Sequence, residues 1–176
     1  MSSLLPTLAT VLLTTGGMLL LLQRLAHGAV PSARGPCRVE TYRPGSKEQI
    51  ALFTRAAILT KLPTTWAHAP GLIAILTRES GGQVGRPNYT YGARAQDPCA
   101  WAGIHTELLA GQKTAKSSAT GLGQLLLANV ETYYPSGRRG IGNAVEEAAG
   151  MLRYIAARYG TPDRAWAQYG VHHEGY

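Results

Sequence analysis

An uncharged apolar run dominates the start of the chain. Residues Leu4–Leu22 are rich in leucine and contain no charged side chain. A helix rises ~1.5 Å per residue, so a run of this length just spans a hydrocarbon core of roughly 30 Å. No Lys or Arg precedes the run, as a cleaved signal peptide would require, although Ala26-His27-Gly28 is a passable cleavage site. We therefore predict a single transmembrane helix as an anchor over residues 1–26, followed by a linker with several Pro and Arg over residues 27–45.

Beyond the linker, apolar residues recur at helical spacing between residues that begin and end helices. Ser46 is a candidate N-cap, with Gln49 three residues later completing a capping box. The expected buried stripe of this first helix is Ile50, Phe53, Ala57 and Ile58. The predicted helices span residues 46–62, 65 or 70 to 80, 101–110, 124–134, 143–159 and 161 onward. The pattern predicts a mainly α domain over residues 46–176, with an irregular stretch at 83–116 that holds a short strand or turn at 89–92.

The composition narrows the range of partners. The formal net charge is +7 and the sequence pI is about 9.7, so the surface attracts polyanions. The chain has no run of Lys or Arg and no zinc-finger or RNP-like pattern, which argues against nucleic acid. An anionic cell wall or membrane surface remains as the candidate partner.

Two cysteines, Cys37 and Cys99, are present, and neither has Cys or His neighbours at zinc-ligand spacing. They pair only if the fold brings them together in an oxidising compartment. If the domain works outside the cytoplasm, we expect one disulfide that ties the linker to the irregular stretch.

Glu79 breaks a local rule of helix composition. It lies in the last turn of a predicted apolar helix, directly before Ser80-Gly81-Gly82. The helix dipole places partial negative charge there, which favours Lys, Arg or His. That charge and an apolar surrounding both favour a protonated carboxyl, as a general acid near neutral pH requires. The competing interpretation is a solvated carboxylate paired with Arg78 or Arg55.

Three segments resemble, in the same order, motifs of the soluble lytic transglycosylase family, which has a goose-type lysozyme-like fold. Leu76-Thr77-Arg78-Glu79-Ser80-Gly81-Gly82 is similar to the family's Glu-Ser motif. Ser117-Ser118-Ala119-Thr120-Gly121-Leu122-Gly123-Gln124 is similar to its Gly-Leu-x-Gln turn. Trp166-Ala167-Gln168-Tyr169-Gly170 lies where Ala-Tyr-Asn is common. The resemblance covers roughly residues 46–170 and implies a lysozyme-like (lytic transglycosylase) domain.

The resemblance implies a role for each matched residue. Glu79 protonates the glycosidic oxygen and then acts as base, and Tyr169 orients or polarises it as the second catalytic residue. Gln124 hydrogen-bonds the glycan, and glycine lets the backbone approach the sugar closely. The substrate-binding residues expected are Ser80, Gly121, Leu122, Gly123, Gln124 and Tyr91. No metal and no other cofactor is implied.

The chain departs from the family's pattern in two places. Gly170 stands where Asn is usual, so polar contacts made by that Asn must come from elsewhere or be missing. Glu79 and Gly121 are 42 positions apart, a long spacing, and the extra region at 83–116 is expected to form a lid or groove wall. Its aromatic residues Tyr89, Tyr91 and Trp101 are candidate platforms for stacking sugars.

The function expected from the resemblance is that of a peptidoglycan lytic transglycosylase. Such an enzyme cleaves the bond between N-acetylmuramic acid (MurNAc) and N-acetylglucosamine (GlcNAc) and leaves 1,6-anhydro ends, so one carboxyl suffices. The first alternative is a muramidase of the same fold, which by inversion needs a second carboxylate roughly 6.5–9.5 Å from the acid. Asp97 is the first candidate for that group and Glu107 the next. The second alternative is a catalytically silent, membrane-anchored wall-binding or virion structural protein.

The expected partners are peptidoglycan glycan strands and, through residues 4–22, a membrane; no nucleic acid is expected. The chain is predicted to be a single-pass protein of the cell envelope, on the periplasmic side, or of the membrane of a virus particle. Several arginines follow the span, and the positive-inside rule would then keep the domain cytoplasmic, which conflicts with wall degradation. His172-His173-Glu174 lacks the spacing of a helical zinc site and is interpreted as a solvated tail.

Overall fold

The computed structural model describes residues 37–112 and 118–172. These residues belong to a compact unit that begins at Pro36. The predicted anchor at 1–26 lies outside the described residues. Within the described ranges, no helix is both long enough and apolar enough to cross a membrane.

The described residues are mainly helical, which confirms the predicted α class. The α-helices are α2 (Lys47–Thr60), α3 (Pro70–Glu79), α4 (Ala93–Gln96), α5 (Trp101–Leu109), α6 (Leu127–Tyr133), α7 (Ala144–Tyr159) and α8 (Pro162–His172). Short 3-10 helices occur at η1 (Thr64–His68), η2 (Tyr89–Tyr91), η3 (Pro98–Ala100) and η4 (Gly137–Gly140). Extended pairing in the described part is limited to isolated bridges, such as that between Thr41 and Gln83.

Three predicted helix starts are confirmed by side-chain caps. Ser46 accepts a hydrogen bond from the backbone of Gln49, and Asn143 accepts from the first turn of α7. Thr161 accepts from the backbone of Arg164 in α8. The reciprocal bond of the first capping box differs from expectation, because the Gln49 side chain accepts from Gly45 N instead and donates to Ala67 O. Gln49 is therefore fully buried and ties α2 to η1.

Two helical predictions were wrong in detail. Ile58 is 66% exposed, because α2 turns the side chains of Leu52, Phe53 and Ala56 toward the core. The helix predicted from Gln124 begins only at Leu127. Thr120 and Leu125 exchange backbone hydrogen bonds across a tight turn, so the chain in between is not free to become helical.

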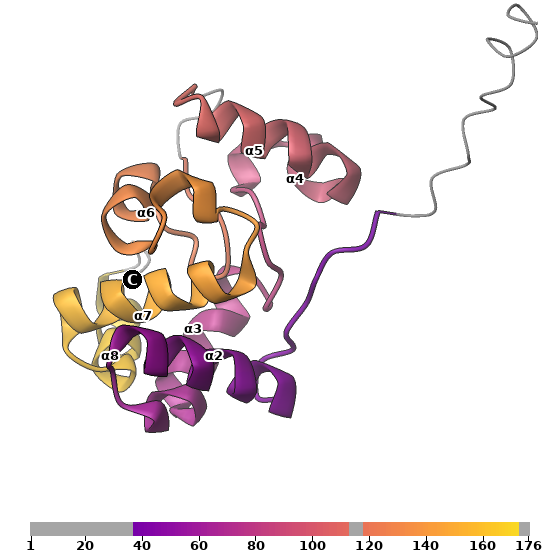
Figure 1. Cartoon of the computed structure of the whole chain (residues 1–176). Helices are drawn as coiled ribbons and strands as arrows, with labels where there is room; N and C mark the ends of the chain where they lie inside the picture. Colours follow the sequence, from indigo (N-terminus) through magenta and orange to yellow (C-terminus); the bar gives the residue numbers. More distant parts are fainter. Residues whose placement is uncertain (1–36, 113–117, 173–176) are drawn as a thin grey trace, which may run out of the picture. The chain divides into compact units, whose positions relative to one another are not determined.

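The main core lies where the long helices meet. α2 packs against α7, and α8 packs against both α3 and α7 (Figure 1). Phe53, Leu76, Met151 and Ile155 are among its fully buried side chains. Burial of each such side chain contributes about 1.5–3 kcal/mol of transfer free energy, and this holds the end of α3 in place.

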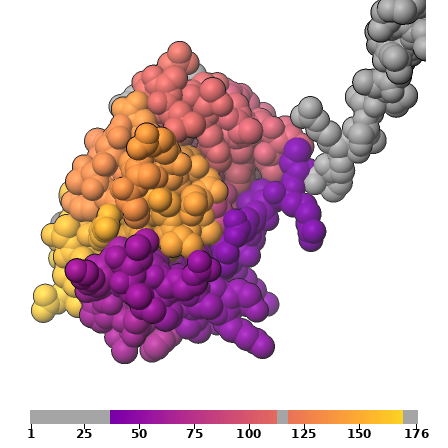
Figure 2. Space-filling view, viewed as in Figure 1, coloured from indigo at the N-terminus to yellow at the C-terminus, as the bar shows by residue number. Residues whose placement is uncertain are grey.

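A smaller apolar cluster supports the region after α3. Ile104 and Leu108 of α5 pack with Tyr91, Ala95 of α4 and Leu127 of α6. In the space-filling view, the α4–α5 region lies at the opposite end of the visible face from α2, with α6 and α7 between them (Figure 2). The described part of the stretch predicted to be largely irregular, residues 83–112, thus contains a small helical cluster, and the predicted helix at 101–110 is confirmed.

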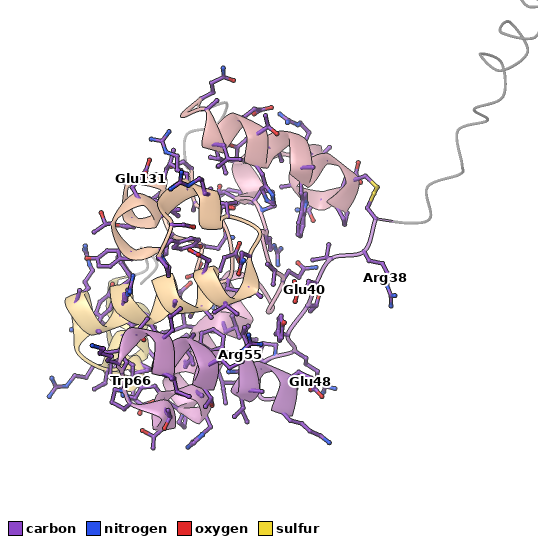
Figure 3. All side chains as sticks on the ribbon, in the orientation of Figure 1. Arg38, Glu40, Glu48, Arg55, Trp66 and Glu131 are labelled. Carbon is purple, nitrogen blue, oxygen red and sulfur yellow. A yellow bond between two sulfur atoms is a disulfide. The ribbon has the colours of Figure 1, made fainter. Side chains whose placement is uncertain are left out.

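The segment before α2 belongs to the domain and is not a free linker. Cys37 and Cys99 form the one disulfide that the sequence analysis considered, with a Cα–Cα distance of 5.2 Å (Figure 3). The backbone of Tyr42 donates to Gly82 O, and Val84 N donates to Glu40 O. The predicted boundary at residue 45 is therefore too late, because pairing partners distant in sequence hold residues 37–45 against the chain that follows α3.

Candidate active site

A cleft of about 870 Å³ opens at the C-terminal end of α3. Its walls come from the end of α3, residues 86–89, residues 119 and 123–126, and parts of α6, α7 and α8. Of the predicted site residues, Glu79, Gly123, Gln124 and Tyr169 line it. The three motif segments, spread over some 90 residues of sequence, thus meet at one cavity.

Glu79 is the last residue of α3 and is half-buried at the cleft wall. Burial raises the pKa of its carboxyl, while a hydrogen bond from Tyr169 and the charge of Arg78 lower it to a smaller extent. The C-terminal end of the α3 dipole also disfavours negative charge. The group therefore holds its proton to higher pH than an ordinary glutamate, which suits a general acid.

Tyr169 reaches the cleft from α8. Its ring stacks on Trp166 with centroids 5.3 Å apart, and the Arg78 guanidinium lies 5.4 Å from its centroid. Burial and the nearby Glu79 carboxyl raise the pKa of Tyr169, so its hydroxyl remains a donor at neutral pH. The predicted pairing of Glu79 and Tyr169 is present, and the contacts with Trp166 and Arg78 help to fix the position of the ring.

The turn before α6 holds Gln124 in a strained conformation. Its φ is +47°, in the left-handed region that non-glycine residues rarely occupy. The side-chain amide nitrogen donates to Arg86 O at 2.7 Å and to Gly121 O at 3.0 Å. These bonds leave the side-chain oxygen as the polar atom that Gln124 offers to a ligand. Strain of this kind is often found at functional sites.

A buried carboxylate that the sequence analysis missed shapes the same turn. Glu147 of α7 is completely buried and accepts hydrogen bonds from the backbone N–H groups of Leu122, Gly85 and Gly142 at 2.8–3.0 Å. Burial raises the pKa of Glu147 to about 7, against the effect of the three N–H donors. A Cβ on Gly121 would collide with this carboxylate, which explains the glycine there. The only signal in the sequence was an acidic residue among the apolar residues of α7.

Four predicted substrate-binding residues are placed elsewhere. Ser80 is buried, and its hydroxyl accepts from Gly82 N. Leu122 packs in the main core, and Gly121 lies over Glu147. Tyr91 is buried in the α4–α5 cluster, because its side chain points away from the cleft that its neighbour Tyr89 lines. These residues position the site and do not form its surface, so we no longer assign them a substrate contact.

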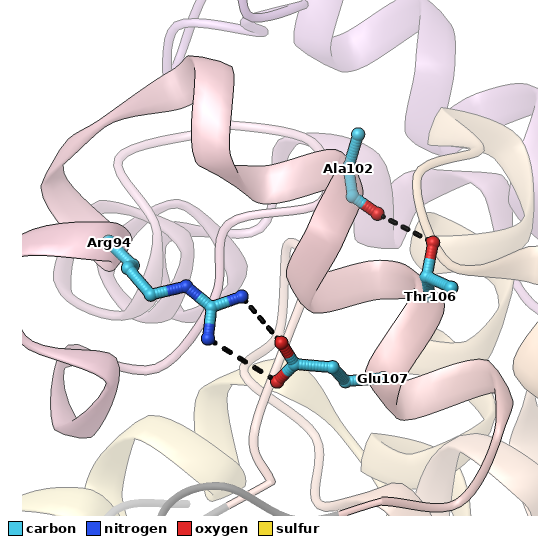
Figure 4. Close-up of polar contacts among 4 residues, drawn as sticks. All are labelled: Arg94, Ala102, Thr106 and Glu107. Atoms are coloured by element: carbon cyan, nitrogen blue, oxygen red, sulfur yellow. Dashed lines mark hydrogen bonds and ion pairs between the residues drawn. The ribbon is translucent and has the colours of Figure 1, made fainter.

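The structure also shows which of the predicted stacking residues and second carboxylates line the cleft. Tyr89 is 77% exposed at the cleft, whereas Trp101 is buried and donates to Ala95 O. Asp97 caps the backbone of Cys99. Glu107 is paired with Arg94 through two hydrogen bonds (Figure 4). Neither acid lines the cleft, and Glu79 is the one acidic residue among its described lining residues.

Gln168 and Asn129 also line the cleft, and neither was predicted. Gln168 precedes Tyr169 in α8, and Asn129 lies in α6. Both amides have donors and acceptors of the kind that bind hydroxyl and acetamido groups. Searches with the chain found no matching family model, no matching curated protein and no matching solved structure.

Proposed function

We propose that this protein is a lytic transglycosylase that cleaves the MurNAc–GlcNAc bond of peptidoglycan. The observation that carries the proposal is the cleft with Glu79 as its only described acidic lining residue, half-buried and hydrogen-bonded by Tyr169. A single carboxyl with a raised pKa matches a reaction in which one group is first acid and then base. The motif resemblance adds the identity of the substrate.

In the proposed reaction, Glu79 protonates the glycosidic oxygen as the bond to the muramoyl carbon breaks. The Glu79 carboxylate then accepts the proton of the muramoyl 6-hydroxyl, whose oxygen bonds to the same carbon. The product ends in a 1,6-anhydro ring, and no water is consumed. Tyr169 holds the Glu79 carboxyl in place through both protonation states.

The hydrolase alternative is less well supported. Inversion requires a second carboxylate across the cleft to activate water. Asp97 and Glu107 make other contacts, and Glu147 lies beneath the turn with all three of its donors from the backbone. Product analysis separates the reactions, because reducing muramoyl ends mean hydrolysis and 1,6-anhydro ends mean transglycosylation.

The deciding experiment is Glu79→Gln, which keeps the shape of the side chain but cannot deliver a proton. General acid–base catalysis contributes about 10²–10⁴-fold, so lytic activity on purified peptidoglycan should fall at least that far. Binding to glycan strands should remain, because the other cleft residues are unchanged. Full lytic activity in the folded variant would refute the function, and no lytic activity in the wild-type protein would favour the silent alternative.

We also propose that the domain works on the oxidising side of a membrane. The Cys37–Cys99 disulfide supports this, since such bonds persist outside the cytoplasm. It outweighs the arginines that follow the apolar run, because the positive-inside rule is a bias with exceptions. The predicted anchor over residues 1–26 would then keep the enzyme next to the wall it cleaves.

A further inference from the structure

The charged residues at the cleft are almost all positive. Arg78, Arg86 and Arg158 line it, with Glu79 as the single described acid among the lining residues. Within the described part of the chain, the ion pairs join Arg94 to Glu107 and Arg138 to Glu131, and neither pair involves a cleft arginine. Arg78 interacts electrostatically with the Glu79 carboxyl, but the charges of Arg86 and Arg158 are not paired with a carboxylate among the described residues.

These arginines are held in place by groups that do not neutralise them. Arg86 donates to Ser80 O at 3.0 Å. Arg78 lies over the Tyr169 ring, and Arg158 lies 6.0 Å from the centroid of the Tyr154 ring. Aromatic faces attract cations without removing the charge. Outside the cleft, by contrast, Arg94 is neutralised by a paired carboxylate (Figure 4).

An uncharged sugar chain has no group that forms an ion pair with these arginines. The pyranose rings, hydroxyls and acetamido groups of the proposed substrate are uncharged. Its carboxylates are attached at the lactyl group of the muramoyl residue, either on the stem peptide or, after the peptide is removed, on the lactyl group itself. Guanidinium groups bind carboxylates through short, charge-assisted hydrogen bonds.

We propose that the cleft arginines bind carboxylates carried by the muramoyl lactyl group, so that the enzyme selects anionic strands over uncharged glycan. This inference rests on the proposed function and names the substrate group, a carboxylate, that the same cleft binds. Arg158 is the residue best placed to show it. It lies in the last turn of α7, whereas Arg78 contacts Tyr169 and Arg86 is bonded to the motif backbone at Ser80.

The helix dipole alone also favours a basic residue at the end of α7. What distinguishes Arg158 from an ordinary helix-end charge is that it lines the cleft together with the other two arginines. A matched control is Arg55 of α2, which is exposed, is absent from the cleft lining and carries the same charge (Figure 3).

The test is equilibrium binding by full-length, detergent-solubilised Glu79→Gln protein, so that no strand is cleaved during the measurement. Three probes are compared: peptide-bearing glycan strands, strands stripped of peptide by an amidase, and a hexamer of N-acetylglucosamine. When Arg158→Gln is introduced into the Glu79→Gln protein, the affinity for one or both anionic probes should fall about threefold to tenfold. The affinity for the uncharged hexamer should not change. Added Arg55→Gln should change none of the three.

The pattern of losses identifies the carboxylate. If binding weakens for peptide-bearing strands alone, the bound carboxylate belongs to the stem peptide. If binding weakens for both anionic probes, the bound carboxylate lies at the lactyl group, or at the first residue of the peptide where the peptide is present. The losses should shrink as salt is raised, because exposed charges are screened. Equal losses on all three probes, or no loss on either anionic probe, would overturn the inference. The lytic assay of Glu79→Gln decides the function separately, since this test involves no turnover.

Discussion

At the scale of single residues, the site depends on two carboxyl groups in opposite surroundings. Glu79 lines the cleft and accepts a hydrogen bond from the Tyr169 hydroxyl, while Glu147 is buried beneath the neighbouring turn. The first is placed for proton transfer, and the second satisfies three backbone N–H groups that would otherwise be buried without acceptors. The same type of side chain thus has the proposed catalytic role in one place and supports loop geometry in the other.

Tyr169→Phe tests the link between Tyr169 and the acid. Glu79 acts as an acid only when protonated, so activity should fall as the pH rises through its pKa. The Tyr169 hydroxyl lowers that pKa, so its removal should raise it and move the alkaline limb of kcat/KM to higher pH. The rate at the optimum should fall less than in Glu79→Gln, because the acid remains.

The matched control for this prediction is Tyr89→Phe. Tyr89 also lines the cleft, and the substitution removes a phenolic hydroxyl as Tyr169→Phe does. Tyr89 is not among the groups that influence the pKa of Glu79. Its pH profile should match that of the wild type. An unmoved alkaline limb in Tyr169→Phe would contradict the assigned hydrogen bond.

Glu147→Gln tests the buried carboxylate. Its two oxygens receive three N–H donors, and an amide nitrogen in place of one oxygen cannot accept. Leaving a buried donor without an acceptor costs about 1–3 kcal/mol, so the free energy of unfolding in urea should fall by that amount. Lytic activity should fall as well, because the turn carrying Gln124 loses its support. Glu146→Gln, one position earlier and only half-buried, should cost less.

At the scale of elements, the short pairing of residues 40–42 with 82–84 deserves a test because it directly follows Glu79. Gly82 has a φ of +80°, and a Cβ there would collide with the carbonyl oxygen of Tyr42. Gly81 has a φ of +64°, but a Cβ there would meet no atom within 4 Å. An alanine at Gly81 therefore tests the cost of the backbone conformation alone, and an alanine at Gly82 adds the collision with Tyr42.

Gly81→Ala should cost about 1–2 kcal/mol of stability, since only the left-handed conformation is penalised. Gly82→Ala should cost clearly more and should also reduce lytic activity, because the pairing that positions the end of α3 must open. Urea unfolding of both variants checks the difference. Equal losses in the two variants would show that the pairing contributes nothing measurable.

At the scale of the whole molecule, the disulfide joins the start of the domain to the α4–α5 region across 62 positions of sequence. Loop-closure entropy gives a stabilisation of about 4 kcal/mol for a bond of this span, as an upper value. The paired Cys37→Ser, Cys99→Ser variant should lose stability up to that amount. Reductant should lower the stability of the wild-type protein and leave the variant unaffected.

The same bond gives a test of location. Protein taken from its native source and treated with a thiol-reactive label before any reduction should remain unlabelled. Two reactive thiols at that stage would contradict a domain on the oxidising side. A truncated domain should include residues from Pro36 onward, because a start at Ser46 removes both Cys37 and the segment that pairs with residues 82–84.

Much of the local structure was determined by sequence alone. The caps at Ser46, Asn143 and Thr161 act over three or four residues, so they predicted helix starts correctly. The position of Glu79 at a helix end followed from the apolar run before it and the glycines after it. Such signals are reliable because the interacting groups are close neighbours in the chain.

Only the tertiary structure decided which face of each element is used. The burial of Glu147 depends on Gly85 and Leu122, which lie 62 and 25 positions away. Tyr91, unlike Tyr89, is buried against Ile104, Leu108 and Leu127 of later helices. No local pattern specifies such partners, because packing and buried hydrogen bonds are satisfied by whichever segments the fold brings together. The sequence therefore predicted Glu79 as the candidate acid, and the packing of α3, α7 and α8 decided which residues surround it.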